Sequence, residues 1–318
     1  MVQGIFIEGL IFGIMVLGVF MTFRVLNFCD MTVDGSFPLG ACVLAACLTH
    51  GISPALALMI VFAAGLLAGL CTTVIYTKLR IPDLLAGILM MTMLYSVNLR
   101  IMSNQANVSF LKVPTIFSSI KQFMKKAFPT VSLDGGVEIP SWVSPDWGIV
   151  IFLVIFVGIL LILLNLFFST DFGLTMGALG SNPQMVISQG VDPRIVRGVG
   201  ICFGDGLAAL SGALFAMYSG FADVGSGSGV VVSGLASLML GEFVIRSNKI
   251  SLQTFRVILG SIIYRALMFL ARRYGYNIGM NANDLKLITG LMIILCLIIS
   301  KQDIVGWFKQ HLKRPERN

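Results

Sequence analysis

Few residues of this chain could do chemistry, and the clearest of them are ionisable side chains inside long apolar segments. Asp205, in the run GICFGDGLAALSG, lies about 12 Å into an expected helix that rises about 1.5 Å per residue. Arg265, in GSIIYRALMFL, is similarly deep. A charged group in hydrocarbon is unfavourable, so it is expected to have a partner or a function. Asp205 and Arg265 could neutralise each other as a buried pair, or line a polar path for a solute.

Other polar residues in or near apolar segments could belong to the same path. The candidate path residues are, besides Asp205 and Arg265, Asn98, Ser226, Ser228 and Ser233. One hypothesis is a self-sufficient transporter driven by an ion gradient, with Asp205 and Arg265 as the coupling pair. Another is a membrane scaffold that transports nothing.

No catalytic motif accompanies these residues. The chain has no GxxxxGK[ST] loop to hold a nucleotide phosphate, and no HExxH or GxSxG motif. Its two histidines, His50 and His311, are far apart in sequence, and its six cysteines form no CxxC pair. We therefore expect no enzyme activity, no metal site and no cofactor bound by this chain.

The composition is that of an integral membrane protein. Hydrophobic residues make up 57% of the 318 residues and charged residues 12%, and the mean hydropathy is +0.92. One water-soluble core could not bury so much apolar surface. The net charge of +7 comes from basic residues at the ends of apolar segments, which indicates membrane topology rather than binding to nucleic acid.

Nine apolar segments could enter the membrane as helices, because alternating strand patterns are missing. The segments are 4–23, 35–48, 54–77, 84–101, 147–168, 194–218, 229–245, 252–270 and 284–300. The second has only about 14 residues, against the roughly 20 that a spanning helix needs, so a broken or re-entrant helix is the alternative there. The sequence thus predicts an all-α, polytopic membrane protein.

Basic residues at the segment ends predict the orientation. Most of them fall on one side if the N-terminus is outside and the C-terminus is in the cytoplasm. The whole chain, 1–318, then forms a single transmembrane domain. Residues 103–145 form an external loop, residues 170–193 form a cytoplasmic segment, and residues 301–318 form a basic cytoplasmic tail.

The external loop contains an amphipathic helical pattern, TIFSSIKQFMKKAF, with apolar residues on one face and lysines on the other. Such a helix could float in the lipid interface or dock on the protein. A weak internal echo also links FCDMTVDGS (28–36) with FADVGSGSG (221–229), each preceding a Gly- and Ala-rich helix. Because the predicted topology places the two copies on opposite sides, they indicate an inverted repeat.

The cytoplasmic segment reads as a turn, a short helix and a turn. Asn182 or Ser181 is suited to cap the helix, Pro183 to occupy its first position, and Gly190 to end it. A helix this short needs outside contacts for stability, which suits a grip for a soluble partner. The candidate coupling residues are Gly177, Gly180, Ser181, Asn182, Pro183, Gln184, Ile187 and Gly190.

At this segment the chain resembles a known family. TMGALGSNPQMVISQGVDPRIVRGVGICFGDGLAALSGAL is similar to the coupling region of permeases from the branched-chain amino acid and sugar branch of bacterial ABC importers. Thr175 and Met176 stand where that family usually has an arginine, which puts one contact with the ATPase in doubt. Further runs, such as FRVLNFCDMTVDGSFPLGA and NANDLKLITGLMIIL, resemble a permease subgroup assigned to tryptophan or tyrosine.

The resemblance implies a type II ABC importer permease in the bacterial cytoplasmic membrane. It implies a second permease chain as a homodimer partner, and a cytoplasmic ABC ATPase dimer that binds ATP and Mg. It also implies an extracytoplasmic substrate-binding lipoprotein, which delivers a small solute such as an amino acid, including an aromatic one. ATP-driven closure of the ATPases would pull on the coupling helix and switch the path between its two faces.

Overall fold

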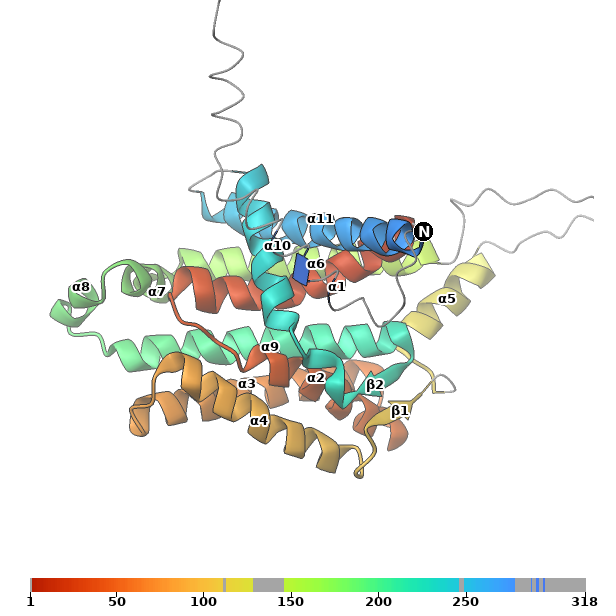
Figure 1. The fold of residues 1–318 in the computed structure, drawn as a ribbon, viewed down its shortest axis with the longest axis horizontal. Helices are drawn as coiled ribbons and strands as arrows, with labels where there is room; N and C mark the ends of the chain where they lie inside the picture. The colour runs from red at the N-terminus through yellow and green to blue at the C-terminus, as the bar shows by residue number, and fades with distance from the viewer. Residues whose placement is uncertain are drawn as a thin grey trace, which may run out of the picture.

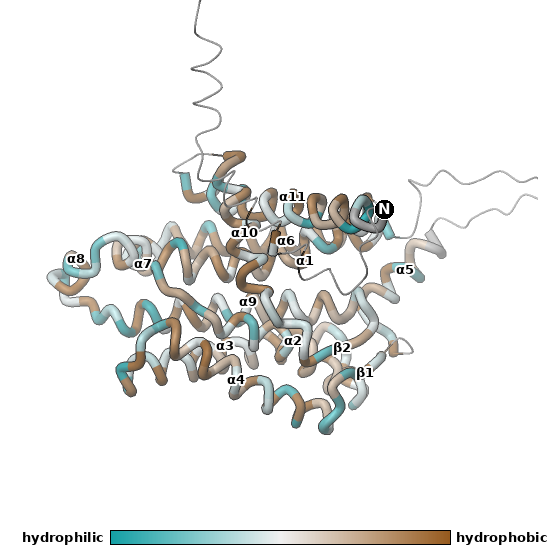
Figure 2. Tube along the Cα trace, viewed as in Figure 1, coloured by the Kyte–Doolittle hydropathy of each residue, from teal (hydrophilic) through white to brown (hydrophobic). Residues whose placement is uncertain are grey.

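A computed structural model of the protein describes residues 2–110, 113–127, 146–245 and 249–277, with isolated positions at 287, 290, 291 and 294. Seven helices within these residues are long and apolar enough to cross a membrane. Most of them run roughly parallel to the longest axis of the molecule (Figure 1). Polar residues gather mainly at the ends of the bundle, and the middles of the helices are mostly apolar (Figure 2). The expected all-α, polytopic fold is confirmed.

The elements follow one another with short connections over most of the chain. The helices are α1 (Val2–Val19), the π-helical η1 (Phe20–Val25) that continues it, α2 (Val33–Thr49), α3 (Pro54–Lys78), α4 (Asp83–Ile101), α5 (Ile116–Ala127), α6 (Asp146–Ser169), α7 (Asp171–Ser181), α8 (Pro183–Ser188), α9 (Pro193–Ser219), the 3-10 helix η3 (Val224–Gly227), α10 (Val230–Val244) and α11 (Ile250–Asn277). The strands are β1 (Asn107–Ser109) and β2 (Phe221–Asp223).

Seven of the nine predicted segments match these spanning helices. The second predicted segment corresponds to α2, an apolar helix of 17 residues that is shorter than the spanning helices. At about 1.5 Å per residue it is about 25 Å long, below the roughly 30 Å of a bilayer core. The ninth segment, 284–300, falls outside the described residues apart from the isolated positions, as does the basic tail 301–318.

Local sequence signals set several helix ends. The long helices α3 and α9 each begin with a proline, where the missing N–H is no loss. The Asp192 carboxylate caps α9 by accepting a hydrogen bond of 2.8 Å from the Arg194 N–H. Gly220 ends α9 in the left-handed conformation, with φ 81°, which glycine adopts without strain.

Helix α9 lies in the middle of the bundle and packs on α1, α2 and α3. Two glycines allow the close approach of α2 and α9. A Cβ at Gly40 would overlap the carbonyl of Ala209, and one at Gly212 would overlap the carbonyl of Phe37. Without a strong hydrophobic driving force between helices in lipid, such close backbone packing is a main source of stability.

Two short helices, α2 and α10, each follow a long helix and a non-helical segment. Residues 26–32 separate η1 from α2, and β2 and η3 separate α9 from α10. The first turns of the two short helices meet, because the Asp34 carboxylate accepts hydrogen bonds from the N–H groups of Gly229 (3.1 Å) and Val231 (2.7 Å). The same order of elements thus occurs at both sites of the sequence echo, and the inverted repeat stays a prediction.

The two ends of the bundle carry different attachments (Figure 1). We call the end with α7 and α8 the α8 end, and the opposite end, with the N-terminus, α5 and the β1–β2 pair, the α5 end. The strands β1 and β2 pair antiparallel, which ties the loop after α4 to the loop after α9. The amphipathic helix α5 docks on α6 through a Phe117–Phe152 ring contact and a 2.9 Å ion pair between Lys121 and Asp146. Docking, one of the two roles considered for this helix, is therefore the one observed.

Candidate functional site

The predicted coupling segment forms a helical hairpin, α7–α8, at the α8 end. The Thr170 hydroxyl caps α7 by accepting from the Gly173 N–H (3.3 Å). The Asn182 side chain caps α8 by accepting from the Met185 N–H (3.4 Å). Gly190 has φ 79°, which a side chain would disfavour, and it turns the chain towards α9. The expected cap and end signals of α8 therefore operate, but the turn expected before α8 is wrong, because Asp171–Ser181 forms the 11-residue helix α7.

One face of α8 is anchored and the other is open. Val186 is fully buried, whereas Met185 and Ile187 are 50% and 49% exposed. Pro183, Gln184 and Ser188 are exposed as well. Exposed apolar side chains at the polar end of a bundle are typical of a surface that another protein covers. Its single buried side chain and short length give α8 few contacts of its own.

The two candidate glycines of α7 have different surroundings. Gly180 lies against the end of η1, where an added Cβ would overlap the Val25 carbonyl oxygen. Gly177 is exposed and has no atom within 4 Å of an added Cβ. Gly180 therefore has a packing role that joins α7 to the first spanning helix, whereas Gly177 is exposed and borders a cavity.

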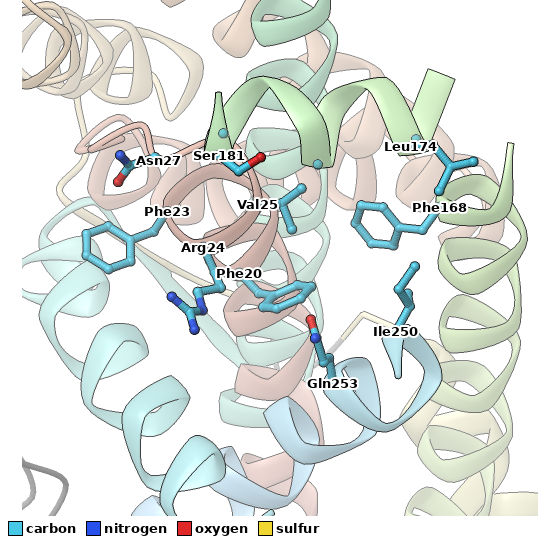
Figure 3. Close-up of a pocket in the computed structure, with 13 residues that line it drawn as sticks. Phe20, Phe23, Arg24, Val25, Asn27, Phe168, Leu174, Ser181, Ile250 and Gln253 are labelled. Atoms are coloured by element: carbon cyan, nitrogen blue, oxygen red, sulfur yellow. The ribbon is translucent and has the colours of Figure 1, made fainter. Parts of the chain in front are cut away.

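A cavity of about 700 Å³ lies at the base of α7. It is enclosed by the end of α1 and η1, by α6, by α7 and by the start of α11 (Figure 3). Its wall is mainly apolar, with Phe20, Phe23, Phe168, Leu174 and Ile250, and polar groups enter at Arg24, Asn27, Ser181 and Gln253. The cavity leaves α7 room to shift relative to α11.

Of the two positions that depart from the family pattern, Met176 turns inward and Thr175 is half-buried. The Thr175 hydroxyl donates to the Asp171 carbonyl oxygen (2.7 Å). Met176 is fully buried. The Ser181 hydroxyl is likewise satisfied within its helix, by donating to the Ala178 carbonyl oxygen (3.0 Å). Neither Thr175 nor Met176 supplies the positive charge of the arginine that the family usually has here.

An ion-pair network near the α8 end was missed by the sequence analysis. The Glu242 carboxylate on α10 binds Arg24 of η1 (2.9 Å) and Arg256 of α11 (2.8 Å). Arg256 is buried, so the carboxylate compensates a desolvated charge. The three residues join the ends of three helices that are far apart in sequence.

The predicted pair between Asp205 and Arg265 does not form. The carboxylate that Arg265 meets is that of Glu8 (3.7 Å), and its guanidinium lies 3.3 Å from the centroid of the Phe12 ring. Asp205 is fully buried on α9, and its polar neighbours are Ser36 and Asp30. Among the described residues, neither oxygen of Asp205 has a hydrogen-bond partner of normal geometry. The two charges face different helices, because α9 turns Asp205 towards α2 and α11 turns Arg265 towards α1.

The other candidate path residues gather around the meeting point of α2 and α10. Asn98 and Ser228 line one cavity of about 320 Å³, together with Asp34 and Tyr95. The Asn98 amide donates to the Gly35 carbonyl oxygen (3.3 Å). Ser226 belongs to η3 in the same loop, and Ser233 lies on α10, where its hydroxyl donates to the Val230 carbonyl oxygen (2.8 Å). The structure thus brings Asn98 and Ser228 together and separates them from Arg265.

In the part of the chain that the structure describes, no group of three or more His, Cys, Asp or Glu side chains could hold a metal ion.

Comparisons with known proteins agree with this architecture. Residues 1–297 match the family model for the branched-chain amino acid transport system / permease component. The chain is 36% identical over 297 residues to the tyrosine transport system permease protein of Clostridioides difficile (strain R20291), covering 93% of this chain and 90% of that protein. It is 31% identical over 296 residues to an uncharacterised protein of Rickettsia prowazekii (strain Madrid E), covering 93% and 96%. No solved structure gives a significant match.

The match extends over both the spanning helices and the α7–α8 hairpin. The protein is therefore a multi-pass membrane permease component of a transport system, and it belongs to the branched-chain amino acid transport system permease family.

Proposed function

We propose that this chain is the membrane subunit of an ATP-driven ABC importer and forms the path for a small solute, an amino acid that can be aromatic. The solute is delivered by an external substrate-binding lipoprotein. A second copy of the chain completes the path as a homodimer, and two cytoplasmic ATPases bind the ATP and Mg. The chain lies in the bacterial cytoplasmic membrane with its N-terminus outside and its C-terminus inside. The printed name of the Clostridioides difficile relative, a tyrosine transport system permease, supports the choice of solute class.

The exposed face of α8 carries this proposal. An ATPase that drives transport must bind the membrane subunit. The α7–α8 hairpin lies at one end of the bundle (Figure 1), and its Met185 and Ile187 are half-exposed. Its open surface comes from the candidate coupling residues Gly177, Ser181, Asn182, Pro183, Gln184, Ile187 and Gly190. Helix α8 carries no charged residue, and its exposed Met185 and Ile187 are apolar, so it suits an apolar groove on a soluble protein.

The contact at Gly180 connects the proposed ATPase-binding surface with the proposed solute path. Because α7 touches the end of η1 at Gly180 and Val25, a displacement of α7 is passed on to the first spanning helix. The cavity at the base of α7 gives room for that displacement. ATP-driven closure of the ATPases would in this way tilt the spans and expose the path to alternate sides.

The test is to replace Ile187 by aspartate and purify the permease with its ATPase. We expect the Ile187→Asp variant to fold but to lose the ATPase and ATP-driven uptake, because a carboxylate in an apolar groove is left unpaired. The matched control is Phe123→Asp on α5, which removes a side chain that is 70% exposed at the opposite end of the bundle. The control should retain the ATPase.

If the Ile187→Asp variant retained its full complement of ATPase, the proposal that α8 binds the ATPase would be rejected. Uptake by the purified permease alone, driven by a proton or sodium gradient without ATP, would instead support the ion-gradient alternative. That alternative has lost its proposed coupling pair, since Arg265 meets Glu8 and not Asp205.

A further inference from the structure

A charged cavity opens at the α5 end, on the opposite side of the bundle from α8. It has a volume of about 310 Å³ and lies between α1, the start of α6, the end of α9 and α11. Its charged and phenolic lining groups are Glu8, Asp146, Tyr218, Arg265 and Arg272. Two acids and two arginines in so small a volume are unusual in a segment that is mostly apolar.

Arg265 is the deepest of these charges and is incompletely paired. Its side chain is only 14% exposed, and its guanidinium rests on the Phe12 ring. The Glu8 carboxylate is 3.7 Å away, longer than the roughly 2.7–2.9 Å of a charge-assisted hydrogen bond. A guanidinium has five N–H donors, so Arg265 keeps the capacity to bind another carboxylate.

The charges are sorted by sign onto different walls. Arg265 and Arg272 lie seven residues apart on α11, about two turns, so both cations are on one face of that helix. Glu8 comes from α1, and Asp146 comes from the first turn of α6, where Lys121 already pairs with it (2.9 Å). The cavity therefore has a positive wall and, facing it, the Glu8 carboxylate, whose ion pair within the described residues is the long contact with Arg265.

We propose that this cavity binds a free amino acid through its zwitterionic head group, with the carboxylate on Arg265 and the ammonium group on Glu8. The inference rests on the proposed function and names the site that selects its solute class. The volume is at the lower end of small-ligand sites, roughly 300–1,000 Å³, and suits one amino acid. A neutral sugar has no ionic group for either charge and would leave them with only their long contact to each other, so the site discriminates against it.

The test measures ligand binding by the complete permease–ATPase complex in nanodiscs without the binding protein. The probes are the twenty standard amino acids and, for each one that binds, the analogue without the carboxylate and the analogue without the ammonium group. For L-tyrosine these analogues are tyramine and 3-(4-hydroxyphenyl)propionate. We expect at least one amino acid to bind, with its two truncated analogues binding about 10-fold or more weakly, because each loses a hydrogen bond to a charged group.

Two variants assign the contacts. Glu8→Gln should remove the preference for the zwitterion over the analogue without an ammonium group, and Arg265→Gln should remove the preference over the analogue without a carboxylate. If Arg265→Gln does not fold, Glu8→Gln still decides the question. Arg100→Gln, an exposed arginine at the end of α4 and outside the cavity, is the control and should change neither preference.

Failure to bind any of the twenty amino acids would overturn the proposal. So would a loss of affinity in Glu8→Gln that is equal for the amino acid and both analogues. These outcomes are distinct from failure of the proposed function, which would appear as a lack of ATP-driven uptake by the wild-type complex with its binding protein. Binding at the α5 end is measured without that uptake.

Discussion

Replacing Gly180 by alanine tests how the α7–α8 hairpin is joined to the spanning helices. The new methyl group would overlap the Val25 carbonyl oxygen, a backbone atom at the end of η1 that cannot rotate away. Overpacking of this kind costs about 1–3 kcal/mol, and the better helix propensity of alanine returns about 1 kcal/mol. We therefore expect a net destabilisation of up to about 2 kcal/mol, with α7 pushed away from η1.

Gly177→Ala is the matched variant on the same helix. With no atom within 4 Å of its Cβ, it should only gain the helix propensity, about 1 kcal/mol. The two variants should thus differ by the overpacking cost alone, about 1–3 kcal/mol in the free energy of unfolding. Denaturant unfolding of each permease in the same detergent measures that difference. The ATPase activity of Gly180→Ala should also become less dependent on solute, since the hairpin moves without the first spanning helix.

Equal unfolding free energies for Gly180→Ala and Gly177→Ala would refute the reasoning. That result would mean that α7 makes no tight contact with η1 and that the hairpin can move independently of the first spanning helix.

Four further substitutions follow from the contacts. Glu242→Gln should destabilise the fold by about 1–3 kcal/mol, because it leaves the buried Arg256 without a counter-charge. Arg24→Gln, at the exposed side of the network, should cost less than about 1 kcal/mol. Thermal unfolding compares the two variants, and equal shifts in melting temperature would contradict the network. Asp34→Ala should cost about 1–2 kcal/mol by removing the acceptor for the first turn of α10, and faster amide hydrogen exchange there should report it. Asn182→Ala should cost about 1 kcal/mol of helix stability in α8 and so lower the amount of ATPase that co-purifies with the permease. An unchanged yield of ATPase would mean that the complex does not need a helical α8.

Much of the fold could be predicted from the sequence because the bilayer imposes simple rules. A run of about 20 apolar residues has few alternatives to a spanning helix, so the long helices were found with small errors at their ends. The cap of α8 was readable as well, since Asn182 and Pro183 act on neighbouring residues. The short α2 was recognised as doubtful by its length alone.

The pairing of charges could not be read in the same way. Whether Arg265 meets Asp205 or Glu8 depends on the rotation of α11 and on the packing of α1 between its neighbours, which hydropathy does not specify. The network around Glu242 has the same difficulty, because its arginines come from η1 and α11. The β1–β2 pair was missed because three-residue strands 100 or more positions apart leave no periodic signal.

The position of Asp34 has a consequence for how the molecule can move. Its backbone belongs to the first turn of α2 while its carboxylate holds the first turn of α10, so separating these helices would leave amide groups unpaired in a medium of low polarity. The two should consequently travel as one rigid body. Bending is then expected in the linker 26–32, where Asn27 has a positive φ of 52°, next to the Val25 carbonyl that α7 touches. A displacement of α8 by the proposed ATPase would reach the linker 26–32 first. The spanning helices around α2 and α10 would then rotate about that rigid unit.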